Sequence, residues 1–226
     1  MRRWLPVLLI ALLPVQARAD LTATYVAPDT HKKTIIQVAA NGDFRMDGGQ
    51  AQQDIIGRGD EAYLIEPRPH GPVVMRATDL FKIVAELVGA PKAKGVTVSV
   101  SALPAVTRKG SVTIKGRVGD AYYAIGPDGR LSARPFLVIS HDPALALLGS
   151  AVARLLALSK ETASGTAGAD KVAAIAALLK DGAPILSPDG ELESVSFAPI
   201  AAARFNLPAS PLPLDEVRRA LTEPTP

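Results

Sequence analysis

Residues 34–47 read TIIQVAANGDFRMD, and the predicted sheet is built outward from them. An apolar run and an alternating run flank the dipeptide Asn41-Gly42. Asn and Gly tolerate the positive φ angles that a two-residue type I′ turn requires at both central positions. The stretch therefore predicts a β-hairpin of strands 34–40 and 43–47, joined by a type I′ turn.

Short runs of similar character lie on both sides of this hairpin, separated by turn residues. They alternate apolar and polar residues or are rich in β-branched residues, as strands are. The proline-rich segment 67–72 is not expected inside the sheet, because proline lacks the donor that a ladder needs. A turn is predicted at Gly119-Asp120. The predicted strands are 21–27, 54–57, 61–65, 73–76, 96–100, 111–118, 120–125 and 131–140.

Further along, apolar residues recur at helical spacing, with capping residues before them or glycine and proline behind them. Because the strands follow one another through hairpins, a parallel sheet is excluded. The predicted fold class is α+β, with a curved antiparallel sheet and helices covering one face. The predicted helices are 78–88, 144–158, 171–180 and 214–221, and two more strands are predicted at 191–197 and 201–206.

Residues 1–19 have the layout of an export signal. Two arginines precede the apolar run 4–15, and the sequence ARA at 17–19 matches an A-x-A cleavage site. The apolar run is shorter than the roughly 20 residues of a transmembrane helix. We therefore expect cleavage after Ala19, a periplasmic location, a single domain over residues 20–226 and no transmembrane span.

Removal of the signal also removes the net charge. The chain has 25 basic and 22 acidic residues, and residues 1–19 hold three arginines and no acid, which leaves 22 of each. A nucleic-acid-binding surface therefore has no support from composition. The chain has no cysteine, which excludes disulfides and thiol chemistry.

No sequence motif indicates a catalytic, metal-binding or nucleotide-binding site. The three histidines, His31, His70 and His141, lack the spacing of metal ligands. A G-x-S-x-G nucleophile motif, a P-loop and a G-x-G-x-x-G loop are all absent from the sequence. We expect no catalytic residue, no metal and no cofactor, although a hydrolytic site built from separated residues stays open.

Segment 143–158 is apolar on nearly all sides. A surface helix has one apolar face, so this one must be buried on two. Two interpretations follow: it belongs to an ordinary core, or it covers an apolar cavity that holds a ligand. In both cases the helical region 142–182 is predicted to be an insertion in the domain.

Three short stretches resemble the LolA/LolB-like superfamily, which includes periplasmic lipoprotein carriers. They are ANGDFRMD at 40–47, AYLI at 62–65 and ARFNLP at 203–208, the last similar to a closing F-x-L-P strand. The resemblance implies an incomplete β-barrel whose apolar concave face is covered by helices and binds acyl chains or hydrophobic peptides. It also implies an arginine inside the cavity that helps to hold the closed state, and Arg45 is the matching residue.

The expected function is that of a periplasmic binding or carrier module for a hydrophobic small molecule or for lipoprotein acyl chains. The alternative is a non-enzymatic module that contacts a protein partner of the cell envelope or acts as a sensor. By alternation Arg45 points away from the side of Phe44 and Met46, and the sequence leaves open which set faces inward. The cavity residues expected are Tyr25, Ile36, Val38, Phe44, Arg45, Met46, Tyr63, Ile65, Phe81, Phe136, Leu148 and Val152.

Overall fold

The computed structural model describes residues 19–48, 53–89, 103–162 and 167–222. The predicted strand 96–100 and the export signal, apart from Ala19, lie outside these ranges. None of the helices in the described part of the chain is long and apolar enough to cross a membrane.

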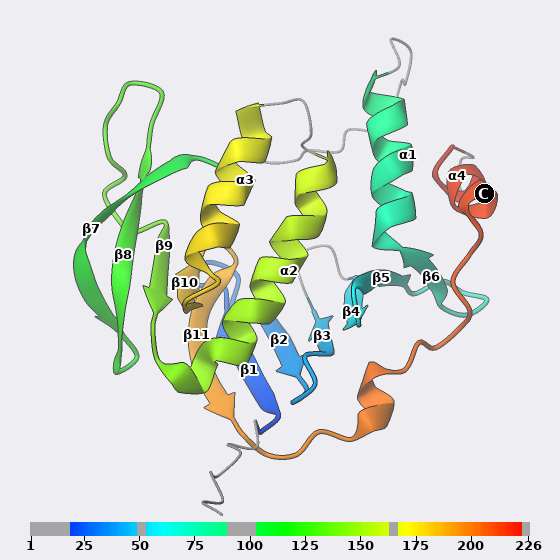
Figure 1. The fold of residues 1–226 in the computed structure, drawn as a ribbon, viewed down its shortest axis with the longest axis horizontal. Coiled ribbons are helices and arrows are strands. Elements are labelled where there is room, and N and C mark those ends of the chain that lie inside the picture. Colours follow the sequence, from blue (N-terminus) through cyan, green and yellow to red (C-terminus); the bar gives the residue numbers. More distant parts are fainter. Residues whose placement is uncertain (1–18, 49–52, 90–102, 163–166, 223–226) are drawn as a thin grey trace, which may run out of the picture.

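The strands form one open antiparallel sheet built from two meanders (Figure 1). The sheet order is β6-β5-β4-β3-β2-β1-β11-β10-β9-β8-β7. The first meander contains β1 (Leu21–Val26), β2 (Lys33–Val38), β3 (Phe44–Asp47), β4 (Asp54–Arg58), β5 (Glu61–Glu66) and β6 (Val73–Arg76). The second contains β7 (Ala105–Ile114), β8 (Arg117–Ile125), β9 (Leu137–Ser140), β10 (Ala183–Ser187) and β11 (Gly190–Ser196).

The two meanders meet where β1 pairs with β11, which places Thr22 opposite Ser196. Each remaining neighbour in the sheet is also paired antiparallel, so the chain never needs a crossover of the parallel kind. The predicted α+β class with an antiparallel sheet is confirmed.

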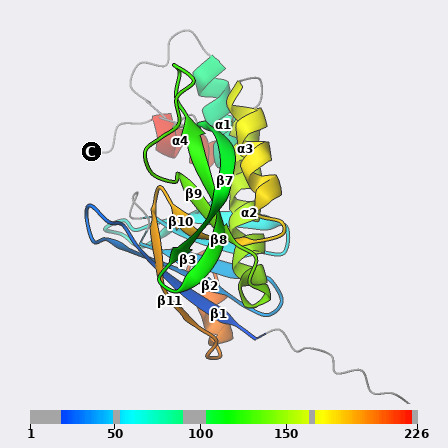
Figure 2. The same cartoon turned by 90° about the vertical axis from the view of Figure 1, so that its left-hand side faces the viewer.

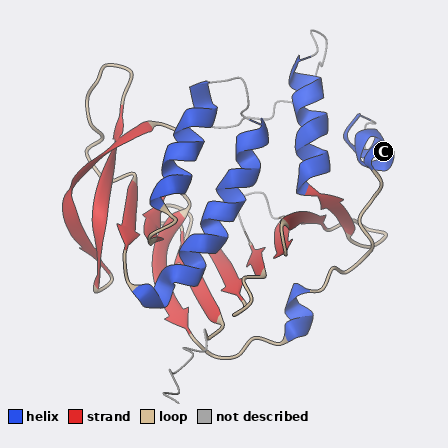
Figure 3. Ribbon diagram, viewed as in Figure 1, coloured by secondary structure: helices blue, strands red, loops and turns tan. Residues whose placement is uncertain are grey.

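The three longest helices lie together on one side of the sheet, as the turned view in Figure 2 and the colouring in Figure 3 show. Asp142 begins the helical region as predicted, because its side chain accepts a hydrogen bond of 2.9 Å from the Ala144 backbone nitrogen and proline follows it. Ile83 of α1 packs against Val217 of α4. The helices are α1 (Ala77–Gly89), η1 (Pro143–Leu145), α2 (Ala146–Thr162), α3 (Ala167–Leu178), η2 (Ala202–Phe205) and α4 (Leu214–Thr222).

The hairpin of β2 and β3 fixes which face of the sheet is buried under α2. Val38 lies opposite Phe44, and Ile36 lies opposite Met46. These side chains share a core cluster or its border with Leu148 of α2, and Phe44 is fully buried. Phe44 and Met46 therefore point toward the helices, on what we call the inner face, and the intervening Arg45 points to the outer face.

The predicted type I′ turn at Asn41-Gly42 is wrong, although the hairpin itself is present. Only Gly42 has a positive φ, of 88°. The Gly42 nitrogen donates to the Ala39 carbonyl, and the Ala39 nitrogen donates to the Asp43 carbonyl, each at 2.8 Å. The loop is therefore one residue longer than a two-residue turn, with glycine in the left-handed position of a bulge.

The predicted turn at Gly119-Asp120 is also wrong. The turn falls at Lys115-Gly116, where φ is 48° and 80°, and Gly119 lies inside β8. A Cβ atom on Gly119 would lie 2.7 Å from the Ile139 carbonyl oxygen of the neighbouring strand. Glycine stands there because the two strands approach closely, and not because the chain turns.

Two strand predictions in the second half also need correction. Residues 201–206 form η2 instead of a strand, and the predicted strand 131–140 is reduced to β9 with an isolated bridge at Leu131. Strand β10 was not predicted, because Pro184 interrupts the apolar run of this short strand.

The segment 197–213, which we call the C-terminal strap, crosses the outer face and contains η2. Arg204 donates to the Gln37 side chain at 3.0 Å and pairs with Asp47. Leu207 packs against the cluster of Ile56, Ile65 and Val74. The Leu212 nitrogen then donates to the Val74 carbonyl at 2.9 Å, so the strap also covers the edge of β6.

Candidate functional site

An apolar cavity of about 460 Å³ lies between the sheet and helices α2 and α3. Pockets that bind small molecules have volumes of about 300–1,000 Å³ and mostly apolar walls. The lining residues are Tyr25, Thr34, Ile36, Met46, Leu103, Phe136, Leu137, Val152, Leu155, Leu156, Ile175, Leu179, Pro184, Ser187, Pro188 and Asp189.

Helix α2 is apolar on two sides because it serves both the core and the cavity. Leu145 and Leu148, at the start of the helical region, are fully buried against the inner face of the sheet. Val152 and Leu155, one and two turns later, line the cavity. The two interpretations of this segment are therefore not exclusive, since one end packs as core and the other forms a wall.

Tyr25 supplies a neutral polar group at the cavity wall. Its side chain is 4% exposed, and its hydroxyl donates a hydrogen bond of 2.5 Å to the Pro184 carbonyl oxygen. Burial raises the pKa of Tyr25 far above its ordinary value, so the phenol stays protonated. The hydrogen bond satisfies the hydroxyl and fixes β1 to β10.

The structure brings five of the expected cavity residues to the lining: Tyr25, Ile36, Met46, Phe136 and Val152. Three others, Val38, Phe44 and Leu148, are core residues of the same inner side but do not line the cavity. Phe81 lies on α1, half-buried, and is not among the lining residues.

Arg45, Tyr63 and Ile65 were expected in the cavity but lie on the outer face. Arg45 lies opposite Ile56, which in turn lies opposite Tyr63, so all of them share one side of the sheet. The Tyr63 and Ile65 side chains pack with Ile56 in the cluster that Leu207 of the C-terminal strap covers. Successive side chains of a strand point to opposite faces of the sheet, and these three side chains point to the face away from the cavity.

Arg45 instead holds the outer face together. Its guanidinium pairs with Asp47 and with Asp54, the second pair at 2.6 Å. Asp47 also accepts from Arg204 of the strap. This network fastens the C-terminal strap, and none of its four residues is among those that line the cavity.

A different arginine, Arg154 of α2, ties the helix to the sheet. Its Nη1 donates to the Gly42 carbonyl at 2.8 Å, and its Nη2 donates to the Gly59 carbonyl. Its guanidinium also lies 5.1 Å from the centroid of the Phe44 ring, a cation–π distance. In the sequence, Arg154 is the single charged residue of segment 143–158. A lone arginine in an apolar helix was the one available signal.

The polar lining residues lie at one end of the cavity. Thr34 lies opposite Tyr25 where β1 ends and β2 begins, and Ser187 lies opposite Gly190 where β10 ends and β11 begins. Asp189 occupies the turn between Ser187 and Gly190. The cavity is therefore amphipathic, with a polar rim of Thr34, Ser187 and Asp189 and apolar walls elsewhere.

A second group of polar side chains surrounds Asp120 on β8. Its carboxylate accepts from Arg108 at 2.6 Å and from Ser111 at 3.1 Å, and lies 3.3 Å from Nε2 of His141. The hydrogen bond from Arg108 lowers the pKa of Asp120. Nδ1 of His141 lies 2.8 Å from the Asp181 carbonyl oxygen, and this hydrogen bond raises the pKa of His141.

This group lacks the geometry of a catalytic triad. Both ring nitrogens of His141 face protein oxygen atoms, and Ser111 contacts Asp120 instead of the imidazole. An activated serine would need its hydroxyl within hydrogen-bond reach of the histidine. Within the described ranges there is also no group of three or more His, Asp or Glu side chains that could hold a metal ion.

Comparisons with known proteins found no matching family model, no match among curated proteins and no match among solved structures.

Proposed function

We propose that the protein is a periplasmic carrier that binds a hydrophobic ligand, such as the acyl chain of a lipid or lipoprotein, in the cavity beneath α2 and α3. This proposal rests on the cavity itself, which has a volume of about 460 Å³ and is lined by Tyr25 and 12 apolar residues among a total of 16. Well-packed cores contain few voids larger than a water molecule, so an apolar space of this size favours a binding role.

The arrangement of the helices is consistent with this role. Helices α2 and α3 form one wall, and the sheet forms the other. Arg154 attaches α2 to two hairpin turns through hydrogen bonds to backbone carbonyls. The cavity-lining end of α2 can move while Leu145 and Leu148 stay packed against the sheet, which allows a ligand to enter and leave. The proposal includes an incomplete β-barrel of the LolA/LolB-like type and export by residues 1–19.

The test is binding of an uncharged fluorescent probe, N-phenylnaphthylamine, to the purified mature chain. Val152→Trp should fill the cavity and lower the affinity at least about tenfold, which corresponds to about 1.4 kcal/mol. Val152→Phe should have a smaller effect in the same direction. The matched control is Val118→Trp, because Val118 is 64% exposed and is not a lining residue.

Urea unfolding of each variant separates filling of the cavity from loss of the fold. Lipid extraction and mass spectrometry of protein purified from the periplasm should also recover bound lipid. If the wild-type chain binds no probe and carries no lipid, the proposal is wrong. Equal affinities for Val152→Trp, Val152→Phe and Val118→Trp would move the binding site away from this cavity.

A further inference from the structure

The polar rim of the cavity carries a negative charge. Among the described lining residues, Asp189 is the one charged side chain, and no lysine, arginine or histidine is present. Tyr25 is neutral, because burial raises the pKa of its hydroxyl. A ligand whose head lies at the polar rim therefore meets two hydroxyl groups and one carboxylate.

Lys33, which is adjacent to Thr34 in the chain, is not among the residues that line the cavity. Lys33 precedes Thr34 on β2, and neighbouring residues of a strand point to opposite faces. The Lys33 ammonium instead lies 3.8 Å from the Glu193 carboxylate, and both side chains are well exposed.

The turn that carries Asp189 is held in place by close contacts. The Asp189 nitrogen donates to the Ser187 hydroxyl at 3.3 Å. Gly190 has a φ of 148°, and a Cβ atom there would lie 2.7 Å from the Val26 carbonyl oxygen. Position 190 therefore requires glycine, and the turn keeps Asp189 among the residues that line the cavity, together with Ser187 and Thr34.

We infer that Asp189, with Thr34 and Ser187, selects the head group of the ligand: the cavity takes apolar chains with an uncharged or cationic head and disfavours free fatty acids. This inference rests on the proposed function. The carboxylate of a fatty acid would lie beside Asp189 without a cation among the lining residues. Two like charges about 4 Å apart repel by about 1 kcal/mol in water, which is about a fivefold change in affinity.

An uncharged head group has no such penalty. The hydroxyls of Thr34 and Ser187 can donate to an ester or alcohol oxygen, and the hydroxyl group is both donor and acceptor. A cationic head would be attracted by Asp189. The expected order of affinity at neutral pH is therefore amine, then alcohol, then carboxylate, for chains of equal length.

The experiment measures displacement of N-phenylnaphthylamine by lauryl amine, lauryl alcohol and lauric acid, each below its micelle-forming concentration. Lauric acid should bind about fivefold or more weakly than lauryl alcohol, and Asp189→Asn should bring the two affinities together. The matched control is Asp128→Asn. Asp128 lies in the other Pro-Asp-Gly turn of the chain, at 127–129, and does not line this cavity.

Equal displacement by the acid and the alcohol in the wild-type chain would overturn the inference, as would an unchanged ratio in Asp189→Asn. Either result leaves the proposed function intact, because the apolar chains still bind. Failure of all three compounds and of the probe would instead count against the proposed function. Urea unfolding of Asp189→Asn shows whether the substitution changes the stability of the fold.

Discussion

Nη1 of Arg154 lies 2.8 Å from the carbonyl oxygen of Gly42 and donates a hydrogen bond to it, which joins helix α2 to the turn between β2 and β3. The same guanidinium donates to Gly59, in the turn between β4 and β5. Arginine suits this position because its planar group presents several donors in a fixed geometry. One side chain thus connects a wall of the cavity to two separate hairpins.

Replacing Arg154 with glutamine should loosen α2. Hydrogen bonds to charged groups contribute about 1.5–3 kcal/mol each, but this side chain is only half-buried, so we expect a loss of about 1–2 kcal/mol in the free energy of unfolding. Amide hydrogen exchange should accelerate in α2 before it does in β1 and β2, and bound probe should dissociate faster. Urea unfolding, hydrogen exchange and stopped-flow fluorescence measure these three effects.

Two further variants test the Arg154 prediction. Arg154→Lys keeps the charge but cannot bind both carbonyls in the same way, so its effect should be intermediate. Arg130→Gln is the control, because Arg130 is exposed and its surface pair with Asp128, at 3.5 Å, contributes little. If Arg154→Gln changes stability and exchange no more than Arg130→Gln does, the attachment of α2 does not depend on Arg154.

Gly149→Ala should destabilise the protein, although alanine usually stabilises a helix by about 0.5–1 kcal/mol relative to glycine. A Cβ atom at Gly149 would lie 2.2 Å from the backbone oxygen of Gly182, and backbone atoms cannot move away easily. We expect a net loss of about 1–3 kcal/mol, measured by urea unfolding. The neighbouring Ser150→Ala is the control: Ser150 is exposed, so its effect should be about 0.5 kcal/mol or less. A stabilised Gly149→Ala variant would show that α2 does not approach Gly182 so closely.

The pair of His141 and Asp120 should make stability depend weakly on pH. The hydrogen bond to the Asp181 carbonyl, and after it the contact with Asp120, raises the pKa of His141 above its ordinary value. A raised pKa in the folded state means that the stabilisation is complete below about pH 6.5 and is lost as the pH rises through the raised pKa. The loss should be less than about 1 kcal/mol, because the His141 side chain is 52% exposed.

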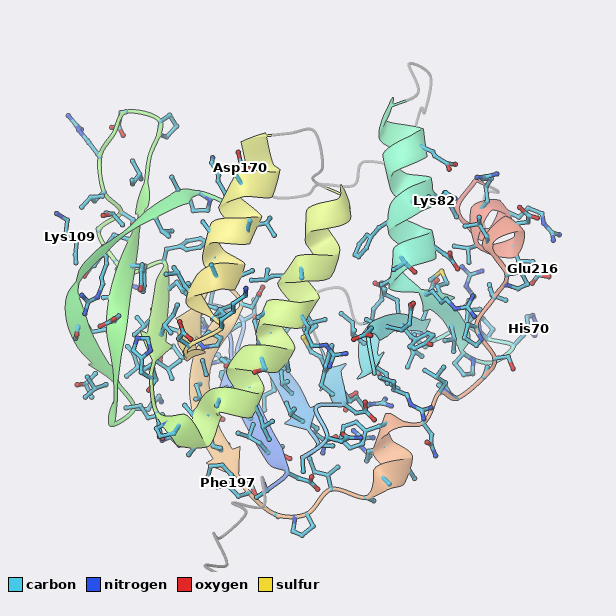
Figure 4. All side chains as sticks on the ribbon, in the orientation of Figure 1. His70, Lys82, Lys109, Asp170, Phe197 and Glu216 are labelled. Atoms are coloured by element: carbon cyan, nitrogen blue, oxygen red, sulfur yellow. The ribbon has the colours of Figure 1, made fainter. Side chains whose placement is uncertain are left out.

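NMR titration of the imidazole signals, with urea unfolding at several pH values, checks this expectation. In His141→Gln this part of the pH dependence should disappear. His70→Gln is the control, because His70 lies on the exposed loop before β6, at the periphery of the molecule (Figure 4). If the titration of His141 is centred below its ordinary pKa, the sign of the predicted effect is wrong.

The alternation of side chains along each strand predicted which residues share a face of the sheet, because one of the two faces is buried. Once Phe44 and Met46 share a face, Ile36 and Tyr25 must follow through the register of β1, β2 and β3. What alternation could not decide is which face the helices cover. That choice depends on α2, whose buried residues make contact only after the chain has folded back on itself.

The remaining errors have local physical causes. Gly119 resembles a turn residue in the sequence, but the approach of a neighbouring strand requires it. Arg154 could not be identified as an attachment point, since its partners are backbone carbonyls of two distant turns, which have no signature in sequence. The position of Asp189 at the cavity rim likewise depends on how β10 and β11 lie beside β1.

The pairing of β1 with β11 makes folding depend on the end of the chain. Strand β1 is among the first segments to be synthesised, and its partner β11 is among the last. A chain that has not reached residue 196 has two half-sheets, each with an open edge at the future junction, and such edges promote aggregation. Contacts so distant in sequence also form slowly. A newly made chain therefore needs protection until nearly all of it is available.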